Sequence, residues 1–194
     1  MSDEDIVKNI VSSYSQKDEN KRKEGINSFS LLFSRYEEKL QRYIKRFVYD
    51  ADDANDILQD VFIKTFQNLN SFDDKYKFNS WIYRITHNEC INYLKKNKKE
   101  GISFVDLDAI MPILFAKETS DELTLSNENK ELIEKALYKL DVKYREVIVL
   151  NFFDDLSYEE ISDILHIPIS TVGVRIKRAK DKLKLLLIEN SNNI

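Results

Sequence analysis

Residues 156–183, LSYEEISDILHIPISTVGVRIKRAKDKL, predict two short helices joined by a tight corner. Ser157 can cap the first helix, and Glu160 three residues later completes the pattern of a capping box. Pro168 ends that helix, because proline disfavours helical backbone in the residue before it. The corner holds His166, a residue type that is enriched at positive φ. This order of elements predicts a helix-turn-helix.

The second helix of this unit has the clearest periodicity in the chain. Ser170 or Thr171 is expected to cap it. At 100° per residue, one stripe collects the apolar residues Val172, Ile176, Ala179, Leu183, Leu186 and Leu187. Between Ser170 and Lys184 there are six Lys or Arg and one Asp, with Lys177 and Arg178 opposite the stripe. A buried stripe and a basic face are typical of a helix that reads the major groove of DNA. The alternative is a core helix with a solvated basic face.

The composition of the 194 residues favours an all-α chain. Three Gly and two Pro are too few for sandwiches, barrels or Rossmann folds, which need frequent turn residues. With a net charge of −4, any DNA binding must come from local basic patches. The single cysteine, Cys90, excludes an internal disulfide, and His87 and His166 lack metal-ligand spacing, so no metal or cofactor is expected. The N-terminus does not resemble a signal peptide and no apolar run approaches about 18 residues, so we expect a cytoplasmic protein without membrane insertion.

A predicted helix from Asp53 to Leu69 carries an acidic face. Asp53, Asp56 and Asp60 are three and four residues apart, so they lie on one side. Such a run can be a solvated face, and acids in a first helical turn are stabilised by the helix dipole. That explanation does not extend to Asp60, which lies well inside the helix beside Gln59. Carboxylates repel one another unless a basic partner arrives, so the face favours docking of a protein. The apolar residues expected to be buried are Ile57, Leu58, Val61, Phe62, Phe66 and Leu69.

A predicted helix from Phe78 to about Lys96 combines an aromatic ring with cations. Asn79 or Ser80 is expected to cap it. One face, at spacings of three and four residues, holds Trp81, Arg84, Asn88, Ile91 and Lys95. An indole beside cations can stack unpaired bases while the cations hold phosphates. The alternative is that Trp81, the single tryptophan, is a core residue.

The patterns divide the chain into four segments. Residues 1–28 are a polar N-terminal extension in which a short amphipathic helix can form, and no role is assigned to it. Residues 29–99 hold the acidic helix and the Trp81 helix. Residues 100–128 carry seven acids against one Lys and are interpreted as an acidic linker. Residues 129–194 hold the helix-turn-helix. We therefore expect two small helical domains joined by an acidic linker.

Three segments in this order resemble the extracytoplasmic-function sigma factors of bacterial RNA polymerase, within the sigma-70 family. Residues 49–62, YDADDANDILQDVF, are similar to that family's core-polymerase-binding helix. Residues 78–95, FNSWIYRITHNECINYLK, are similar to its helix that melts the promoter and reads the minus-ten element. Residues 140–187 resemble its region 4, which reads the minus-thirty-five element. The resemblance covers residues 29–187, with region 2 and region 4 but no region 3 domain between them.

The resemblance implies that the protein binds core RNA polymerase, through the β′ and β subunits, and directs it to specific promoters. The polymerase would do the chemistry, so no catalytic residue is expected. The residues that would meet a basic coiled-coil surface of β′ are Asp53, Asp56, Gln59 and Asp60. Those that would meet the minus-ten DNA, beside a base-holding loop at Ser71–Lys77, are Phe78, Ser80, Trp81, Arg84, Asn88 and Lys95. Those at the minus-thirty-five element would be Ser170, Thr171, Val174, Arg175, Lys177 and Arg178.

The second helix of the helix-turn-helix departs from the family at its base-reading positions. Gly173 and Val174 carry no hydrogen-bonding side chain there, and Gly173 costs about 1 kcal/mol in a helix interior relative to Ala. We expect Lys177 and Arg178 to supply most polar contacts, while Val174 touches a thymine methyl group. His166 also stands where the family usually has Gly. The chain is therefore expected to be a weak reader of the minus-thirty-five element on its own.

Two other functions account for part of the sequence. A stand-alone helix-turn-helix regulator explains residues 156–183 but leaves the acidic face and the Trp81 helix without a role. A protein-interaction module, such as an inhibitor or adaptor, would use the basic helix to meet an acidic partner. An enzyme is the least favoured class, because no paired catalytic acids, metal cluster or Gly-rich phosphate loop is present. Many members of the resembled family are held inactive by an anti-sigma factor, which is a further candidate partner.

Overall fold

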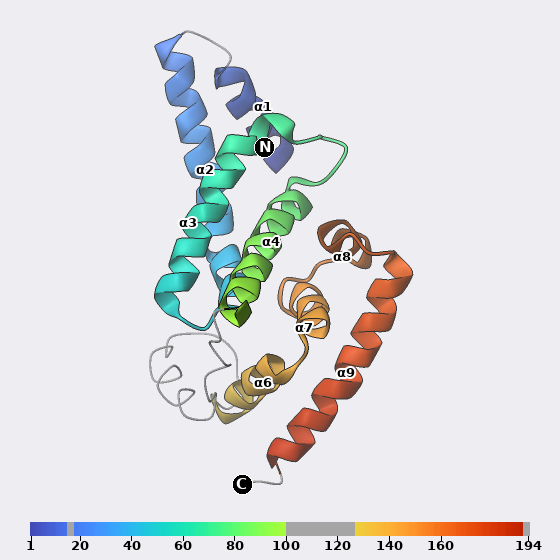
Figure 1. Cartoon of the computed structure of the whole chain (residues 1–194). Coiled ribbons are helices and arrows are strands. Elements are labelled where there is room, and N and C mark those ends of the chain that lie inside the picture. The colour runs from blue at the N-terminus through green and yellow to red at the C-terminus, as the bar shows by residue number, and fades with distance from the viewer. Residues whose placement is uncertain (15–17, 100–126, 192–194) are drawn as a thin grey trace.

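The computed structural model describes residues 1–14, 18–99 and 127–191, and Figure 1 shows that they form helices connected by short loops. The all-α prediction is confirmed for these residues. The α-helices are α1 (Asp3–Tyr14), α2 (Glu19–Lys45), α3 (Ala51–Asn68), α4 (Phe78–Lys99), α6 (Asn127–Lys139), α7 (Val142–Ile148), α8 (Tyr158–Leu165) and α9 (Ile169–Ser191). A 3-10 turn, η1 (Leu69–Ser71), follows α3, and a π-helical turn, η2 (Val149–Phe153), follows α7. Among the described helices, none combines the length and apolar character needed to cross a membrane.

Helices α1 to α4 form the first bundle (Figure 1). α2, α3 and α4 pack on one another, and buried aromatic rings join them. Tyr36 and Tyr43 on α2 meet Phe78 and Tyr83 on α4, with ring centroids 5.5 Å apart in each pair. α1 packs on α2 and adds to the core the side chains of Ile6, Val7 and Ile10. The N-terminal segment without an assigned role is therefore part of this bundle.

Helices α6 to α9 form the second bundle, in which α6, α7 and α8 all pack against α9. The predicted capping box is present, since Ser157 Oγ accepts from the Glu160 N–H at 3.2 Å and Glu160 Oε2 accepts from the Ser157 N–H at 3.0 Å. His166 ends α8 in the left-handed conformation, with φ 53°. The apolar stripe of α9 is buried at Val172, Ile176 and Ala179. The predicted helix-turn-helix is confirmed in its capping box, its corner and the buried part of its apolar stripe.

The predicted cap of α9 is wrong, because α9 begins at Ile169, so that Ser170 and Thr171 lie inside its first turn. The carbonyl of Pro168 accepts from the N–H groups of Thr171 and Val172 at 2.8 and 3.1 Å. These bonds start the helix from the backbone. Proline also fixes its own φ near the helical value, so a side-chain cap is unnecessary.

The predicted cap of α4 is also wrong. α4 begins at Phe78, so Asn79 and Ser80 lie in its first turn. The backbone N–H of Phe78 instead donates to Glu4 Oε1 on α1, at 3.0 Å. A cap from so far along the chain has no local sequence signal.

Most of the predicted acidic linker, residues 100–126, lies outside the described residues. α6 begins at Asn127, so residues 127–128 belong to a helix.

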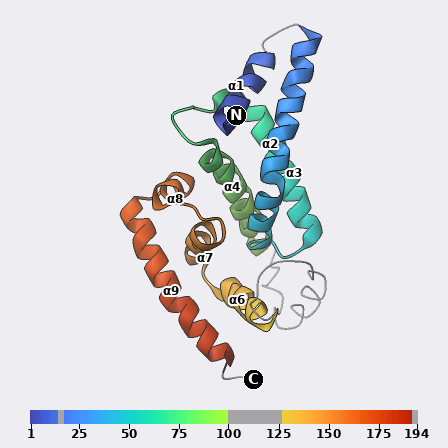
Figure 2. The same ribbon diagram turned by 180° about the vertical axis from the view of Figure 1, so that it is seen from behind.

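The two bundles pack directly on each other. α8 lies against α4, and both Figure 1 and Figure 2 show α7 and α8 between α4 and the outer helix α9. Tyr83 of α4 donates to Asp154 Oδ1 at 3.1 Å, and the Tyr138 hydroxyl of α6 donates to the carbonyl of Lys45 at the end of α2. The structure is therefore a closed arrangement of the two bundles.

Candidate nucleic-acid and protein interfaces

The acidic face of α3 divides into two parts. Asp56, Gln59 and Asp60 are exposed. Asp53 is half-buried, and its Oδ2 accepts a hydrogen bond from the hydroxyl of Tyr93 on α4 at 2.6 Å. This bond holds Asp53 at the junction of α3 and α4, so the carboxylates that reach solvent most openly are those of Asp56 and Asp60.

An apolar groove of about 760 Å³ lies beside these acids, between α2 and α3. Asp56 and Gln59 line it together with four phenylalanines, Phe29, Phe33, Phe62 and Phe66. Phe66 is 41% exposed, so the prediction that it is buried is wrong. Phe29 meets it edge-on with ring centroids 5.0 Å apart, and the rest of the ring faces the open groove. The sequence signal for the groove is the wide apolar face of α3. The neighbouring helices do not cover all of it.

The first turn of α4 is buried. Phe78, Ser80 and Trp81 are 0%, 4% and 8% exposed. The indole ring of Trp81 packs on Phe72 and Phe78, with centroids 5.5 and 5.6 Å away. Phe78 is therefore a core side chain, and Trp81 combines a core position with an edge at the surface. Further along the predicted DNA face, Arg84 is half-buried, and Asn88 and Lys95 are exposed.

Two hollows flank Trp81 and Arg84. One, of about 270 Å³, is formed by the first bundle alone and is also lined by Lys64, Asn68, Ser71, Ile85, Asn88 and Glu89. The other, of about 190 Å³, lies between α4 and α8 and is also lined by Tyr76, Ser80, Ser162, Asp163 and His166. Within the described residues, the hydroxyl of Ser80 is buried without a hydrogen-bond partner. Four of the predicted minus-ten residues, Ser80, Trp81, Arg84 and Asn88, thus line surface hollows, one of which is shared with the second bundle.

The first helix of the helix-turn-helix covers part of the α4 face. Arg84 Nη1 lies 3.3 Å from His166 Nε2, and Lys77 Nζ pairs with Glu160 Oε1 at 3.1 Å. Sequence reasoning assigned His166 and Glu160 only to the local geometry of the helix-turn-helix. Their contacts with the first bundle depend on tertiary packing, which no local pattern encodes.

A buried polar cluster lies deeper in the contact between the bundles. His87 Nδ1 and the hydroxyl of Tyr43 are hydrogen-bonded at 3.0 Å, and His87 Nε2 lies 3.6 Å from Glu146 Oε2 on α7. Burial lowers the pKa of His87 to about 4, so the imidazole is neutral near pH 7. Burial raises the pKa of Glu146 to about 7, against the opposing effect of Arg175, and raises the pKa of Asp154 to about 6. The contact is therefore sensitive to protonation.

Two arginines of the second bundle point inward. Arg175 Nη1 donates to Glu146 Oε1 at 2.6 Å, so this predicted DNA contact is engaged with α7. Arg145 is 2% exposed, and its guanidinium donates to the carbonyls of Tyr138, Leu140 and Arg46 at 2.5, 3.2 and 3.5 Å. Burial lowers the pKa of Arg145 to about 10, so it remains charged at neutral pH. Arg145, which sequence reasoning missed, joins the end of α6 to the first bundle.

The outer face of α9 is open. Val174 is 50% exposed, and Ser170, Lys177 and Arg178 are also exposed, while Thr171 is half-buried. A Cβ atom on Gly173 would lie 3.5 Å from the ring of Tyr158, which is an ordinary contact. Packing inside the second bundle therefore does not require a glycine at this position.

Within residues 1–14, 18–99 and 127–191, no group of His, Cys, Asp and Glu side chains has the arrangement of a metal site. Cys90 is a buried free thiol whose pKa is raised by burial.

The Sigma-70 region 2 family matches residues 32–100, and the Sigma-70 region 4 family matches residues 130–183. The chain is 32% identical over 172 residues to the ECF RNA polymerase sigma factor SigW of Bacillus subtilis (strain 168), covering 81% of this chain and 88% of the relative. It is 36% identical over 163 residues to the ECF RNA polymerase sigma-E factor of Escherichia coli (strain K12), covering 80% and 84%. The chain belongs to the extracytoplasmic-function (ECF) sigma factors.

Two solved structures share the fold. The sigma factor RpoE in complex with the anti-sigma factor NepR from Bartonella quintana matches with a TM-score of 0.69 and 24% identity, covering 82% of this chain and 96% of that one. CnrH in complex with the cytosolic domain of CnrY matches with a TM-score of 0.65 and 23% identity, covering 94% and 97%. At these identities the likeness concerns the fold alone.

As an ECF sigma factor, the protein binds core RNA polymerase and promoter DNA and directs transcription initiation. Sigma factors are in general non-enzymatic initiation factors, and its homologues act with RNA polymerase in the cytoplasm.

Proposed function

We propose that three surfaces have separate roles in initiation. The acidic face and groove of α3 hold core polymerase, the α4 face takes the opened minus-ten strand, and the outer face of α9 binds the minus-thirty-five duplex. The observation that carries the proposal is the exposed basic face of α9, at Lys177 and Arg178, within the segment that matches region 4.

Docking on polymerase uses charge and apolar area together. Asp56 and Gln59 line the groove and Asp60 is an exposed acid on the same helix, so they orient a basic partner surface, and the phenylalanines of the groove supply area to bury. Asp53 contributes charge from its position beside Tyr93. The partner that fits this combination is a basic helical surface of β′ with exposed apolar side chains, and the resemblance to ECF sigma factors points to its coiled coil.

At the minus-ten element, Trp81 offers the edge of a ring for an unpaired base, and Arg84, Asn88 and Lys95 supply polar and positive groups along the strand. Phe78 acts indirectly, by supporting the indole ring from the core. Ser80 lies in the hollow between α4 and α8 with an unused hydroxyl. Because α8 lines the same hollow, the two bundles must separate before a nucleotide can enter it.

At the minus-thirty-five element, Lys177 and Arg178 make the polar contacts, Val174 offers a methyl contact, and Ser170 and Thr171 lie near the phosphates at the start of α9. Arg175 has to leave Glu146 to reach DNA. Its role therefore depends on breaking a contact between α9 and α7 inside the second bundle.

We also propose that the protein works in the cytoplasm with the polymerase and performs no catalytic step of its own. An anti-sigma factor is a further proposed partner, because RpoE, which has this fold, is bound by NepR.

The test is to add the purified protein to core RNA polymerase and a genomic promoter library, and to map transcript starts. A set of starts that share minus-ten and minus-thirty-five elements supports the proposal. A protein that binds no core polymerase, or starts no transcript, overturns it. Tight operator binding without polymerase would support the stand-alone regulator instead.

The docking surface has a matched test. Asp56→Lys combined with Asp60→Lys should weaken core binding at least tenfold, because two attractive charges become repulsive. Glu19→Lys combined with Glu24→Lys is the control with the same change in net charge, since Glu19 and Glu24 are exposed acids elsewhere on the first bundle. Equal losses from both variants would assign the effect to net charge alone.

A further inference from the structure

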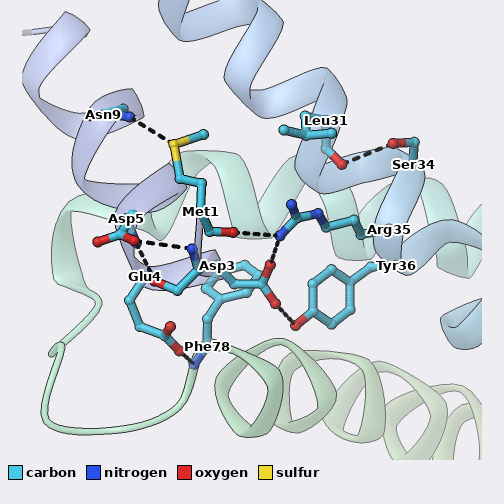
Figure 3. A network of polar contacts seen from close by, with 11 residues as sticks. Met1, Asp3, Glu4, Asp5, Asn9, Leu31, Ser34, Arg35, Tyr36 and Phe78 are labelled. Carbon is cyan, nitrogen blue, oxygen red and sulfur yellow. Dashed lines mark hydrogen bonds and ion pairs between the residues drawn. The ribbon is translucent and has the colours of Figure 1, made fainter.

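The N-terminal helix α1 lies against the start of α4 and the loop before it, as Figure 3 shows. The Sigma-70 region 2 family match begins at residue 32, so α1 is outside it. α1 therefore lies next to the proposed minus-ten site.

α1 is anchored firmly at its N-terminal end. Ser2 and Asp5 exchange hydrogen bonds of 3.0 and 3.1 Å, in the manner of a helix cap. Asp3 accepts from the hydroxyl of Tyr36 at 2.6 Å and from Arg35 Nη1 at 2.5 Å, both on α2 (Figure 3). Together with the buried side chains of its inner face, these bonds fix the position of α1 on the bundle.

α1 also lies unusually close to α2 at its other end. A Cβ atom on Gly25 would lie 2.8 Å from the Cβ of Ser13, so only glycine permits this approach. The whole length of α1 is therefore held on α2.

Two side chains of α1 contact the start of α4 and the loop before it. Glu4 Oε1 accepts the N–H of Phe78 at 3.0 Å and so caps α4 with a negative charge, which the helix dipole favours. Lys8 Nζ pairs with Asp74 Oδ2 at 3.0 Å in the loop between η1 and α4. The loop is closed within itself by the bond from the Tyr76 N–H to the carbonyl of Asp73, at 3.1 Å.

The braced segment carries the side chains that would contact the extruded base. Tyr76 of the loop and Ser80 and Trp81 of the first turn line one hollow. Phe72, at the start of the loop, packs on Trp81. A shift of the start of α4 would move these groups relative to one another.

We propose that α1 braces the minus-ten reading loop, with Glu4 and Lys8 as positioning residues that set how selectively an unpaired base is held. The proposal rests on the proposed role of α4 in minus-ten binding. It assigns a specific purpose to the N-terminal helix, beyond its share of the apolar core.

The experiment uses the full chain assembled with core polymerase, and a promoter obtained from the transcript map. The probes are single-stranded non-template oligonucleotides spanning the minus-ten element, either intact or with one base replaced by an abasic site. The ratio of the two affinities reports base selectivity. Core binding and capture of duplex minus-thirty-five DNA are measured in parallel, since a general folding defect would change them too.

Glu4→Ala should lower the selectivity ratio by about fivefold, as the loss of a helix cap would. Glu4→Gln keeps an acceptor for the Phe78 N–H and should recover most of the ratio. Lys8→Ala, which changes only an exposed side chain, should give a smaller loss in the same direction. The control Glu24→Ala removes an exposed acid far from the loop and should change nothing.

Unchanged selectivity in Glu4→Ala and Lys8→Ala, with core binding intact, would overturn the proposal. A loss of core binding with an unchanged ratio would also overturn it, because α1 would then be structural only. If the wild-type holoenzyme opens no promoter, the proposed function itself fails, which separates the two outcomes.

Discussion

The two helices that would meet DNA, α4 and α9, are presented in opposite ways. The first turn of α4 is buried, at Phe78, Ser80 and Trp81, and α8 lies over its face. The outer face of α9 is open to solvent at Val174, Lys177 and Arg178. In the closed arrangement, duplex DNA can reach α9 directly, whereas a base can enter the hollow between α4 and α8 only after α8 moves. We propose that opening of the two bundles controls access to the hollow between α4 and α8, and that it leaves the outer face of α9 unaffected.

The largest effect is expected from removing the buried link between the bundles. Arg145→Ala leaves the carbonyls of Tyr138, Leu140 and Arg46 without their donor, so it should lower the free energy of unfolding by about 3 kcal/mol or more. Urea denaturation measures this. Arg178→Ala, on the exposed face, should change it by less than about 0.5 kcal/mol. Similar losses of unfolding free energy in the two variants would contradict the difference between the buried Arg145 and the exposed Arg178.

The exposed face of α9 is tested by measuring promoter binding. Replacing Lys177 or Arg178 with Ala should weaken promoter binding by the holoenzyme by about 1–3 kcal/mol if the contact is to a base. A smaller loss with a reduced salt dependence would assign the contact to phosphate. Lys184→Ala, further along α9, controls for the loss of one positive charge. Full-strength binding by both variants would contradict the assignment.

Replacing Gly173 is expected to change the free energy of unfolding by about 1 kcal/mol. Gly173→Ala should stabilise the second bundle by up to that amount, because alanine favours helix and its Cβ meets Tyr158 at an ordinary 3.5 Å. If DNA approaches the backbone here, promoter affinity should fall although the protein is more stable. Thermal unfolding and promoter titration of the same variant separate the two effects. A gain in both would mean that the glycine has no part in DNA binding.

The smallest effect is a pH dependence of the closed arrangement. The pKa of Glu146 is raised to about 7, so its stabilising contribution is complete below the ordinary value of 4.5 and is lost as the pH rises through 7. The pKa of Asp154 is also raised, to about 6, so its stabilising contribution is likewise present at low pH and is lost as the pH rises through 6. The pKa of His87 is lowered to about 4, so its contribution to stability depends on pH in the opposite direction. This contribution is present above pH 6.5 and is lost as the pH falls toward 4.

Between pH 6.5 and 8 Glu146 therefore makes the largest of the three contributions. Over this range the free energy of unfolding should fall by no more than about 1 kcal/mol. Denaturation at the two pH values checks this. Glu146→Gln should make the curve flat, and a wild-type stability that rises with pH would refute the role of Glu146.

The parts of the molecule that could be predicted from sequence are those whose causes are local. Ser157 and Glu160 cap α8 across one turn, and the stripe of α9 follows from helical periodicity alone. His166 takes a positive φ because its own position in the corner demands it. The family resemblance gave the order of the functional surfaces in the same way, from contiguous motifs.

The parts that could not be predicted depend on contacts between distant segments. Glu4 caps α4 from the far end of the chain, and Arg175 turns toward Glu146 instead of outward. Phe66 continues an apolar face that looks buried in sequence, yet no described helix covers it fully. In each case the residue type suits two environments, and only tertiary packing chooses between them.

The coupling between opening and minus-ten reading is tested most directly by the distance between α8 and the loop before α4. Fluorophores on Lys75→Cys and Glu159→Cys, both at exposed positions near the Lys77–Glu160 ion pair, would report it, since the native Cys90 is buried. We expect a short separation in the free protein and a much longer one in the complex with core polymerase and promoter. A transcribing complex that keeps the short separation would contradict the account.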